Sequence, residues 1–207
     1  MRDLLHRSYI AVDGGGTSCR FALNVPGKVI SIRRGSANVF SAPDAAIETL
    51  KSGLVDLAAQ AGIAEVQLVD VPLYAGLAGV TDAGSAQVVA DMLPCRHVRV
   101  EDDRRSAVVG ALGARPGCLI GIGTGSFLAR QSGQEIAFVG GYGAVLGDEA
   151  SAGWLGMALL RRALQVLDGV ECTSDLVEDC LTEFQHDAVQ IVRFTATAQP
   201  ADYGIYA

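Results

Sequence analysis

An aspartate followed by three glycines is the stretch of this sequence best suited to phosphate chemistry. Asp13 and Gly14–Gly16 come directly after a short apolar segment, Ile10–Val12, that is typical of a strand. Glycines adopt backbone angles that other residues avoid, so their N–H groups can converge on an anion. In dinucleotide folds and P-loop enzymes such glycines open a helix. Here the alternating segment Cys19–Val25 and the turn Pro26–Lys28 predict a β-hairpin, which fits neither motif.

A second segment repeats this layout. Cys118–Ile136 contains an apolar strand, a Gly-Thr-Gly-Ser loop, a second strand, a glycine turn and a third strand, and its Thr124 aligns with Thr17. The repeat predicts two lobes from a duplicated unit, whose glycine loops face each other as the two jaws of a phosphate clamp. The alternative for the first loop is a tight hairpin turn without a ligand, in which Asp13 caps the turn.

Two adjacent acids follow a later strand. Asp102 and Asp103 come at the carboxyl end of the predicted strand His97–Glu101, where open α/β sheets bind ligands. A carboxylate in this position can serve as a general base. The same pair can also be a solvated acidic patch or a helix N-cap before Arg104, and the spacing alone favours the cap.

The composition narrows the classes of partner and compartment. Half of the 207 residues are hydrophobic and the formal net charge is −7, which argues against nucleic acid and anionic membranes as partners. We expect no membrane span, no signal peptide and a cytoplasmic protein. The cysteines and histidines are scattered without metal-ligand or disulfide spacing, so we expect reduced thiols that behave as small buried hydrophobes. These residues are Cys19, Cys95, Cys118, Cys172, Cys180, His6, His97 and His186.

The first half of the chain alternates strands and helices, which predicts an α/β layer with a partly antiparallel sheet. We expect caps for the first helix at Ser41 or Asp44 and a stop at Gly62. After the first hairpin, the expected elements are strand Val29–Arg33, helix Asp44–Gln60, strand Val66–Tyr74, loop Ala75–Val80, helix Ser85–Leu93, strand His97–Glu101 and helix Arg105–Leu112.

The second half continues differently. Its strands are followed by a helix over Ser151–Val166, with Trp154 predicted in the core, and by a helix over Ser174–Phe184. The helix–strand units that complete the first lobe do not recur, so by internal symmetry the second lobe is unfinished. We therefore expect two domains, residues 1–115 and 116–207.

Six motifs in order resemble one known family. They are "DGGGTSCRFAL", "GSANVF", "GLAGV", an acid before "AVVGALGA", "GIGTGS" and "GGYGAVLGDEASAGWLG". The chain resembles the sugar-kinase side of the BadF/BadG/BcrA/BcrD ATPase family, within the actin-like, hexokinase and Hsp70 ATPase superfamily, and is most similar to N-acetylglucosamine and glucosamine kinases. The resemblance implies an α/β fold of two ribonuclease-H-like lobes with mixed sheets, with the second lobe cut short.

The resemblance also implies an activity and a site. The activity is transfer of the γ-phosphate of ATP to the 6-hydroxyl of an amino sugar, with Mg²⁺ as the metal and Asp103 as the catalytic base. Asp13 would hold Mg²⁺ through water. The implied phosphate-binding residues are Gly15, Gly16, Thr17, Thr124 and Gly125, and the implied sugar-binding residues are Asn38, Asp103, Ser126, Gly141, Tyr142, Gly143 and Asp148. Relatives commonly dimerise, so a homodimer is among the expected partners.

Several alternatives stay open at this point. Asn38 can equally be a turn residue without a ligand, and Asp148 can be an acidic residue in the first turn of a helix. Asp102 and Phe127 depart from residues that relatives carry at these positions. The chain can also be a truncated or non-catalytic binding member. A further alternative is the ATPase that activates 2-hydroxyacyl-CoA dehydratases, although the cysteine spacing does not match the iron–sulfur cluster of those activators.

Overall fold

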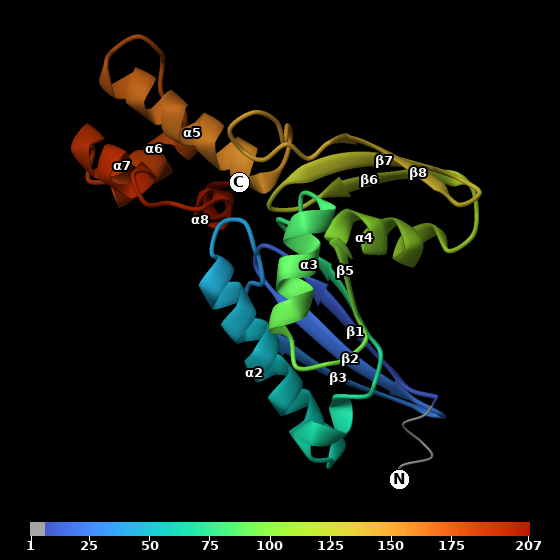
Figure 1. Cartoon of the computed structure of the whole chain (residues 1–207). Coiled ribbons are helices and arrows are strands. Elements are labelled where there is room, and N and C mark those ends of the chain that lie inside the picture. The colour runs from blue at the N-terminus through green and yellow to red at the C-terminus, as the bar shows by residue number, and fades with distance from the viewer. Residues whose placement is uncertain (1–6) are drawn as a thin grey trace. The chain divides into compact units, whose positions relative to one another are not determined.

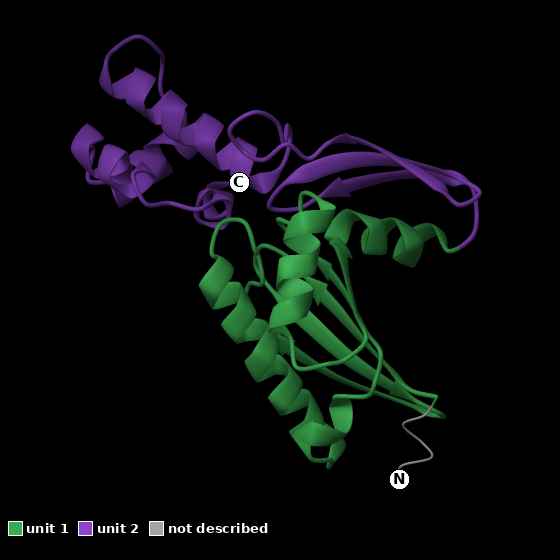
Figure 2. Ribbon diagram, in the orientation of Figure 1, with its two compact units in different colours: residues 1–113 green, residues 114–207 purple. Residues whose placement is uncertain are grey.

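The computed structural model describes residues 7–207, so His6 and the start of the first expected domain lie outside the described residues. The chain divides into two compact units between Gly113 and Ala114, drawn in green and purple in Figure 2. The assignment of domains 1–115 and 116–207 itself stays a prediction. In residues 7–207 we find no helix that is both long and apolar enough to span a membrane.

The first unit is built on a five-stranded mixed sheet in the order β3-β2-β1-β4-β5 (Figure 1). The strands β1, β2 and β3 form the antiparallel meander that the hairpin pattern predicts. The strands β4 and β5 add in parallel beside β1. Their bounds are β1 Tyr9–Gly14, β2 Cys19–Val25, β3 Lys28–Arg34, β4 Leu73–Leu77 and β5 Val98–Asp102.

Helices cover this sheet. The helices α2 (Pro43–Ala61) and α3 (Ala83–Met92) contribute buried side chains to one apolar core, in which Leu50, Leu54 and Phe21 are almost completely buried. The helix α4 (Asp103–Leu112) packs against β4 and β5. It meets β4 at Gly76, which alternates with the core residues of that strand and therefore faces away from α2 and α3.

The predicted strand Val66–Tyr74 is wrong in its first part. Glu65–Leu68 is a short 3-10 helix, and the strand runs instead over Leu73–Leu77, into the segment predicted as a loop. Leu68 and Val71 are buried in the core without belonging to the sheet, so their apolar character reflects burial alone. Pro72 lacks the N–H that a central strand needs, which favours a strand beginning after it.

Only one of the two ends of α2 agrees with the prediction. Gly62 takes a left-handed conformation (φ 69°) and ends the helix, as predicted. At the other end the N-cap is Ala42, which makes no side-chain capping bond, so the predicted caps Ser41 and Asp44 are wrong. Proline in the first turn of α2 fixes φ there and needs no hydrogen-bond acceptor.

The second unit combines an antiparallel three-stranded sheet with a helical cluster (Figure 1). The helices α5, α6 and α7 contribute the buried Leu160, Leu181 and Ile191 to a separate apolar core. Phe184, Phe194 and the last tyrosines close this core with edge-on and tilted ring contacts. The bounds are β6 Gly117–Ile122, β7 Ser126–Ser132, β8 Glu135–Gly140, α5 Ala152–Leu167, α6 Asp175–Glu183, α7 Ala188–Thr195 and α8 Pro200–Tyr203.

Two core predictions need correction. Trp154 is 36% exposed on α5, so it is not the core residue that its helical spacing suggests. The thiols are free, but only Cys19, Cys95 and Cys180 are buried, whereas Cys118 and Cys172 are exposed. Burial raises the pKa of the Cys19 thiol to about 12, so Cys19 stays a neutral, unreactive thiol.

The contact between α2 and the sheet yields a stability prediction. A Cβ on Gly53 would lie 2.6 Å from Cε2 of Phe21, whose ring is fully buried and cannot retreat. Gly53→Ala should therefore lower the free energy of unfolding by about 1–3 kcal/mol. Gly110→Ala is the matched control, because that glycine is exposed on α4 with open space around it and should gain about 0.5–1 kcal/mol. Chemical denaturation measures both, and an equal effect of the two substitutions would contradict the packing argument.

Candidate active site

The β1–β2 loop is held by close backbone contacts. A Cβ on Gly14 would lie 2.6 Å from Cδ2 of Leu77 and 3.1 Å from Cβ of Ala37, so only glycine fits there. The Gly14 carbonyl accepts a hydrogen bond from the Ala78 amide at 2.7 Å. Neither Gly14 nor the two glycines after it has a positive φ. The expectation of unusual backbone angles is therefore wrong, and close approach is the reason for glycine at residue 14.

The loop leaves part of its polar backbone available. The Gly15 amide donates to the Ser18 carbonyl at 2.9 Å, which closes the turn and removes this N–H as a phosphate donor. Within residues 7–207, no acceptor is recorded for the amides of Gly16 and Thr17. Two N–H groups and the exposed Thr17 hydroxyl are therefore free to meet an anion at the tip of this loop.

Asp13 ends β1 beside this loop. Its side chain is 57% exposed, and its Oδ2 lies 3.7 Å from Nε of Arg20 on the neighbouring strand. No group of three His, Cys, Asp or Glu side chains in the described residues is arranged to hold a metal ion. A single exposed carboxylate beside free amides matches the donor set with which proteins bind magnesium together with substrate phosphates.

Asp103 begins α4, and tight packing places it at the end of the parallel strands. A Cβ on Gly76 of β4 would lie 3.0 Å from Cβ of Ser106 and 3.4 Å from Cα of Asp103, so glycine permits this approach. The Ser106 hydroxyl donates to the Asp103 carbonyl at 2.7 Å. Gly76 lies within the "AGLAG" stretch, but its role depends on α4 and is not visible in the sequence.

Asp102 caps the same helix, as its spacing predicts. Its carboxylate accepts hydrogen bonds from the Arg104 backbone N–H at 2.9 Å and from the Arg104 Nε at 2.7 Å. Burial raises the pKa of Asp103 to about 7, and the negative charges of Asp102 and then Asp13 add to this effect. Asp103 therefore titrates near neutrality while Asp102 holds the start of the helix.

An ionic network secures α4 and the two strands next to it. The Tyr74 hydroxyl donates to Glu101 at 2.9 Å, which links β4 to β5. Arg105 on α4 lies 3.3 Å from the same carboxylate. Burial opposes ionisation of Glu101, but the hydrogen bond from Arg99, followed by the contacts with Tyr74 and Arg105, holds the pKa of Glu101 below its usual range. The network anchors the first turn of α4 from which Asp103 projects.

Asn38 is used as a turn residue. Its Oδ1 accepts hydrogen bonds from the amides of Phe40 and Ser41 at 3.0 and 3.1 Å. Gly79 lies against this turn with φ 86°, and a Cβ there would lie 2.5 Å from the same oxygen. The turn interpretation left open by the sequence is therefore confirmed. Only the Nδ2 donors of Asn38 are left for a ligand.

The glycine loop of the second unit packs on the first residues of α5 and on Asp148 in the segment before it. The amides of Ala152 and Gly153 donate to the carbonyls of Gly123 and Thr124 at 2.9 and 3.2 Å. A Cβ on Gly125 would lie 2.6 Å from Oδ2 of Asp148. The structure thus brings Thr124, Gly125 and Asp148 together, although they are more than twenty residues apart.

The remaining predicted residues of this unit surround that contact. The Ser126 hydroxyl donates to the Glu149 carbonyl at 2.8 Å. Gly141 and Gly143 take positive φ values, and Tyr142 between them is 75% exposed. Asp148 is only 7% exposed and has a left-handed φ of 59°, so it is not a first-turn helix acid. The N-cap of α5 is Ser151.

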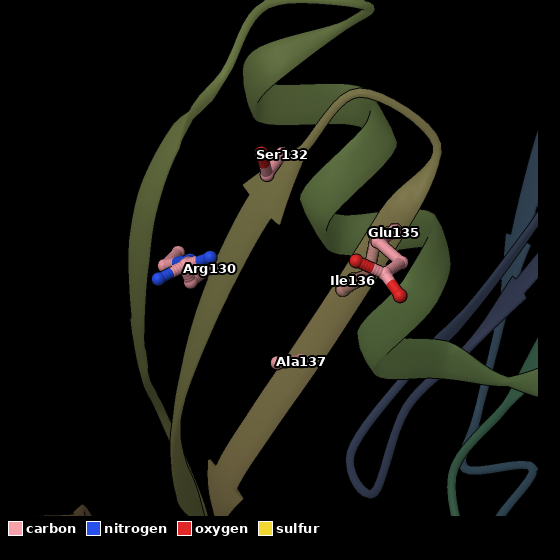
Figure 3. Close-up of a pocket in the computed structure, with 5 residues that line it drawn as sticks. All are labelled: Arg130, Ser132, Glu135, Ile136 and Ala137. Atoms are coloured by element: carbon pink, nitrogen blue, oxygen red, sulfur yellow. The ribbon is translucent and has the colours of Figure 1, made fainter.

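A separate hollow lies at the β7–β8 turn, away from these loops. Figure 3 shows the side chains along it, with Arg130 on β7 and Glu135 on β8. Ser132, Ile136 and Ala137 complete its lining. None of the predicted site residues borders this hollow, so we assign it no part in the candidate site.

Comparison with known proteins identifies the family. The sequence pattern of the BadF/BadG/BcrA/BcrD ATPase family matches residues 10–201. The chain belongs to this family. The resemblance inferred from the six motifs is thereby confirmed.

One known protein and two solved structures are similar to this chain. A glucosamine kinase, GspK, of Vibrio cholerae is 28% identical over 199 residues, which cover 95% of this chain and 68% of that protein. The structure of a protein described as a putative N-acetylglucosamine kinase from Chromobacterium violaceum is 26% identical, with a TM-score of 0.84, covering 97% of this chain and 72% of that one. MreB5 of Spiroplasma citri bound to ADP shares the fold, with 13% identity, a TM-score of 0.50 and coverage of 86% and 62%. The predicted actin-like α/β fold is confirmed, with a mixed sheet in the first unit, whereas the sheet of the second unit is antiparallel throughout the described strands.

The raised pKa of Asp103 predicts how stability depends on pH. The native carboxyl group has a pKa of about 7, against 3.8 in an ordinary setting, so the folded state binds this proton more tightly than the unfolded chain. The contribution of Asp103 to stability should therefore fall as the pH rises from about 4 to about 7 and level off above. Asp103→Asn removes this loss and should be more stable than the wild type at pH 8.

Denaturation at a series of pH values tests this expectation. Asp91→Asn is the control, because that carboxylate is exposed on α3 and accepts a hydrogen bond from the neighbouring Gln87 amide. Its stability relative to the wild type should not change between pH 4 and pH 8. If the difference in stability between Asp103→Asn and the wild type were also independent of pH, burial would not raise the pKa of Asp103.

Proposed function

We propose that the protein is an ATP-dependent sugar kinase that phosphorylates the 6-hydroxyl of an amino sugar, with Asp103 as the general base. The acceptor class is N-acetylglucosamine or glucosamine. The observation that carries the proposal is a partly buried carboxylate at the start of α4, directly after the carboxyl end of β5, where burial and the charges of Asp102 and Asp13 raise the pKa of Asp103. Relatives named as kinases for these two sugars support the same assignment.

The residues of the first unit fit a magnesium–nucleotide complex. We assign the phosphates to the amides of Gly16 and Thr17 and to the Thr17 hydroxyl. Gly15 shapes the turn and contributes no amide of its own. Asp13 would hold the hydration shell of Mg²⁺, a hard cation that keeps several waters when bound by one carboxylate and phosphates. When bound, the metal ion neutralises phosphate charge during transfer.

Asp103 supplies the step that the acceptor needs. A hydroxyl attacks phosphorus most readily when its proton leaves as the new O–P bond forms, and a carboxylate can accept that proton. A pKa of about 7 leaves a large fraction of Asp103 ionised at neutral pH and makes it a stronger base than an ordinary aspartate. The Asp102 cap and the Gly76 contact hold this carboxylate at the start of α4.

We assign the sugar contacts to Asn38 through its Nδ2 donors, to the exposed Tyr142 with its flanking glycines, Gly141 and Gly143, and to Ser126 and Asp148. The second glycine loop, Thr124 and Gly125, is assigned to phosphate. Asp148 lies against Gly125, so these two assignments support each other within one unit.

The activity is tested with a panel of acceptors. The purified chain with Mg²⁺ and ATP should phosphorylate N-acetylglucosamine or glucosamine in preference to glucose and N-acetylmannosamine. Asp103→Asn should reduce kcat/KM by about 10²–10⁴-fold, because a positioned general base contributes that much. Asp91→Asn, an exposed carboxylate on α3, should leave the rate unchanged.

Two results would contradict the proposal in different ways. Sugar binding without turnover, measured by calorimetry, would identify a non-catalytic binding member of the family. Turnover that survives Asp103→Asn unchanged would keep the kinase and remove Asp103 as the base.

The pKa of Asp103 also predicts the pH dependence of catalysis. The base must be ionised in the free enzyme, so kcat/KM should rise with pH and level off above an apparent pKa of about 7. Below pH 6 the rate should fall about tenfold for each pH unit. Steady-state rates in buffers of constant ionic strength measure this limb, and a limb near pH 4 would mean that the carboxylate is unperturbed.

A further inference from the structure

One row of side chains crosses three strands at the base of the first glycine loop. Asp13 on β1 pairs directly with Arg20 on β2, and Arg20 pairs directly with Arg33 on β3. Directly paired residues of antiparallel strands point to the same face of a sheet. Two guanidinium groups and one carboxylate therefore share one face, next to the loop that ends at Ser18.

The two arginines differ in whether a carboxylate lies close enough to neutralise their charge. Arg20 lies 3.7 Å from Asp13, and both side chains are largely exposed. Arg33 donates to the neutral Ser18 hydroxyl at 3.1 Å and takes part in none of the ion pairs of residues 7–207. The neighbouring Arg34, by contrast, is paired with Asp56 on α2. One of the two positive charges in the row is therefore left without a carboxylate.

This arrangement is unfavourable without an anion. Like charges directly opposite each other on adjacent strands destabilise a sheet. The next paired residues on the same face are the small Ala11, Ala22 and Ser31, and the side chains of Arg20 and Arg33 are exposed. The unaccepted amides of Gly16 and Thr17 lie at the tip of the loop that Arg33 contacts through Ser18.

We propose that Arg20 and Arg33 bind the polyphosphate of the nucleotide together with the free amides of the β1–β2 loop. Guanidinium groups match phosphate oxygens in a bidentate geometry and form charge-assisted hydrogen bonds with them. Arg33 reaches the loop through Ser18, and Arg20 leaves the weak contact with Asp13 for a phosphate oxygen. This frees the Asp13 carboxylate for the hydration shell of Mg²⁺. The inference deepens the proposed kinase function and rests on it for the nucleotide.

Calorimetric binding to the purified full chain tests the row directly, without turnover. The probes are ATP with Mg²⁺, inorganic tripolyphosphate, and glucosamine 6-phosphate as the alternative phosphate ligand. Arg20→Gln and Arg33→Gln should each weaken the binding of ATP and of tripolyphosphate about 10- to 100-fold, because each removes a charged hydrogen-bond donor. Arg33→Lys should recover part of the affinity, since it keeps the charge but loses the bidentate geometry.

Arg96→Gln is the matched control. Arg96 also pairs with an exposed aspartate, Asp70, at 2.6 Å, and it precedes β5 at the opposite end of the sheet from Asp13. It should bind ATP like the wild type. Thermal unfolding reports on folding: without anions, Arg20→Gln should be no less stable than the wild type, because it removes the like-charge pair. At the same concentration, tripolyphosphate should raise the unfolding temperature of the wild type more than that of Arg33→Gln.

Each of the other outcomes contradicts one specific part of the proposal. Unchanged ATP affinity in both arginine variants overturns the row and leaves the kinase proposal intact. Weakened binding of glucosamine 6-phosphate alone assigns the row to a sugar phosphate and overturns the nucleotide assignment. The wild type can also bind tripolyphosphate but not ATP, with tripolyphosphate binding lost in both variants. This result keeps the anion site and contradicts the proposed kinase. A wild type that binds neither compound overturns the row, and the acceptor panel then decides on the kinase separately.

Discussion

The approach of α4 to β4 at Gly76 is the contact on which the placement of Asp103 depends. Because Gly76 has no Cβ, Ser106 and the backbone of Asp103 pack directly on the strand. The first turn of α4 is then held by the Asp102 cap and by the ion pair from Arg105 to Glu101. Three separate interactions thus fix one helix start, and the carboxylate that projects from it is partly removed from water.

Burial and charge act on this carboxylate in the same direction. Removal from water raises the pKa of Asp103, and the nearby charges of Asp102 and Asp13 raise it further. The fold loses stability when such a group ionises, which is a common cost of a reactive side chain. The strands beside the β1–β2 loop show a related feature, since Arg20 lies between Arg33 and Asp13 and two guanidinium groups share one carboxylate. Both places therefore bring like charges close together in the folded protein.

The success of sequence interpretation varied with the kind of signal. The β1–β2–β3 hairpins and the amphipathic α2, α5 and α6 follow local periodicity, and their predicted positions agree with the structure. The strand predicted over Val66–Tyr74 was wrong in its first part, because an apolar run indicates burial but not whether the backbone joins a sheet. The predicted burial of Trp154 was wrong for a similar reason, since the spacing of apolar residues on a helix does not show what covers the apolar face of that helix.

The residues alone are sufficient for most elements of the first unit, the two glycine loops and the family, because these depend on local patterns and on ordered motifs. The environments of the site residues depend on contacts between distant segments. Gly76 against Ser106, Asp148 against Gly125 and Arg20 against Arg33 join positions that are from thirteen to thirty residues apart. Desolvation and Coulomb interactions act over a few ångströms of space regardless of separation along the chain. The pKa of Asp103 and the open charge of Arg33 are for that reason properties of the folded protein.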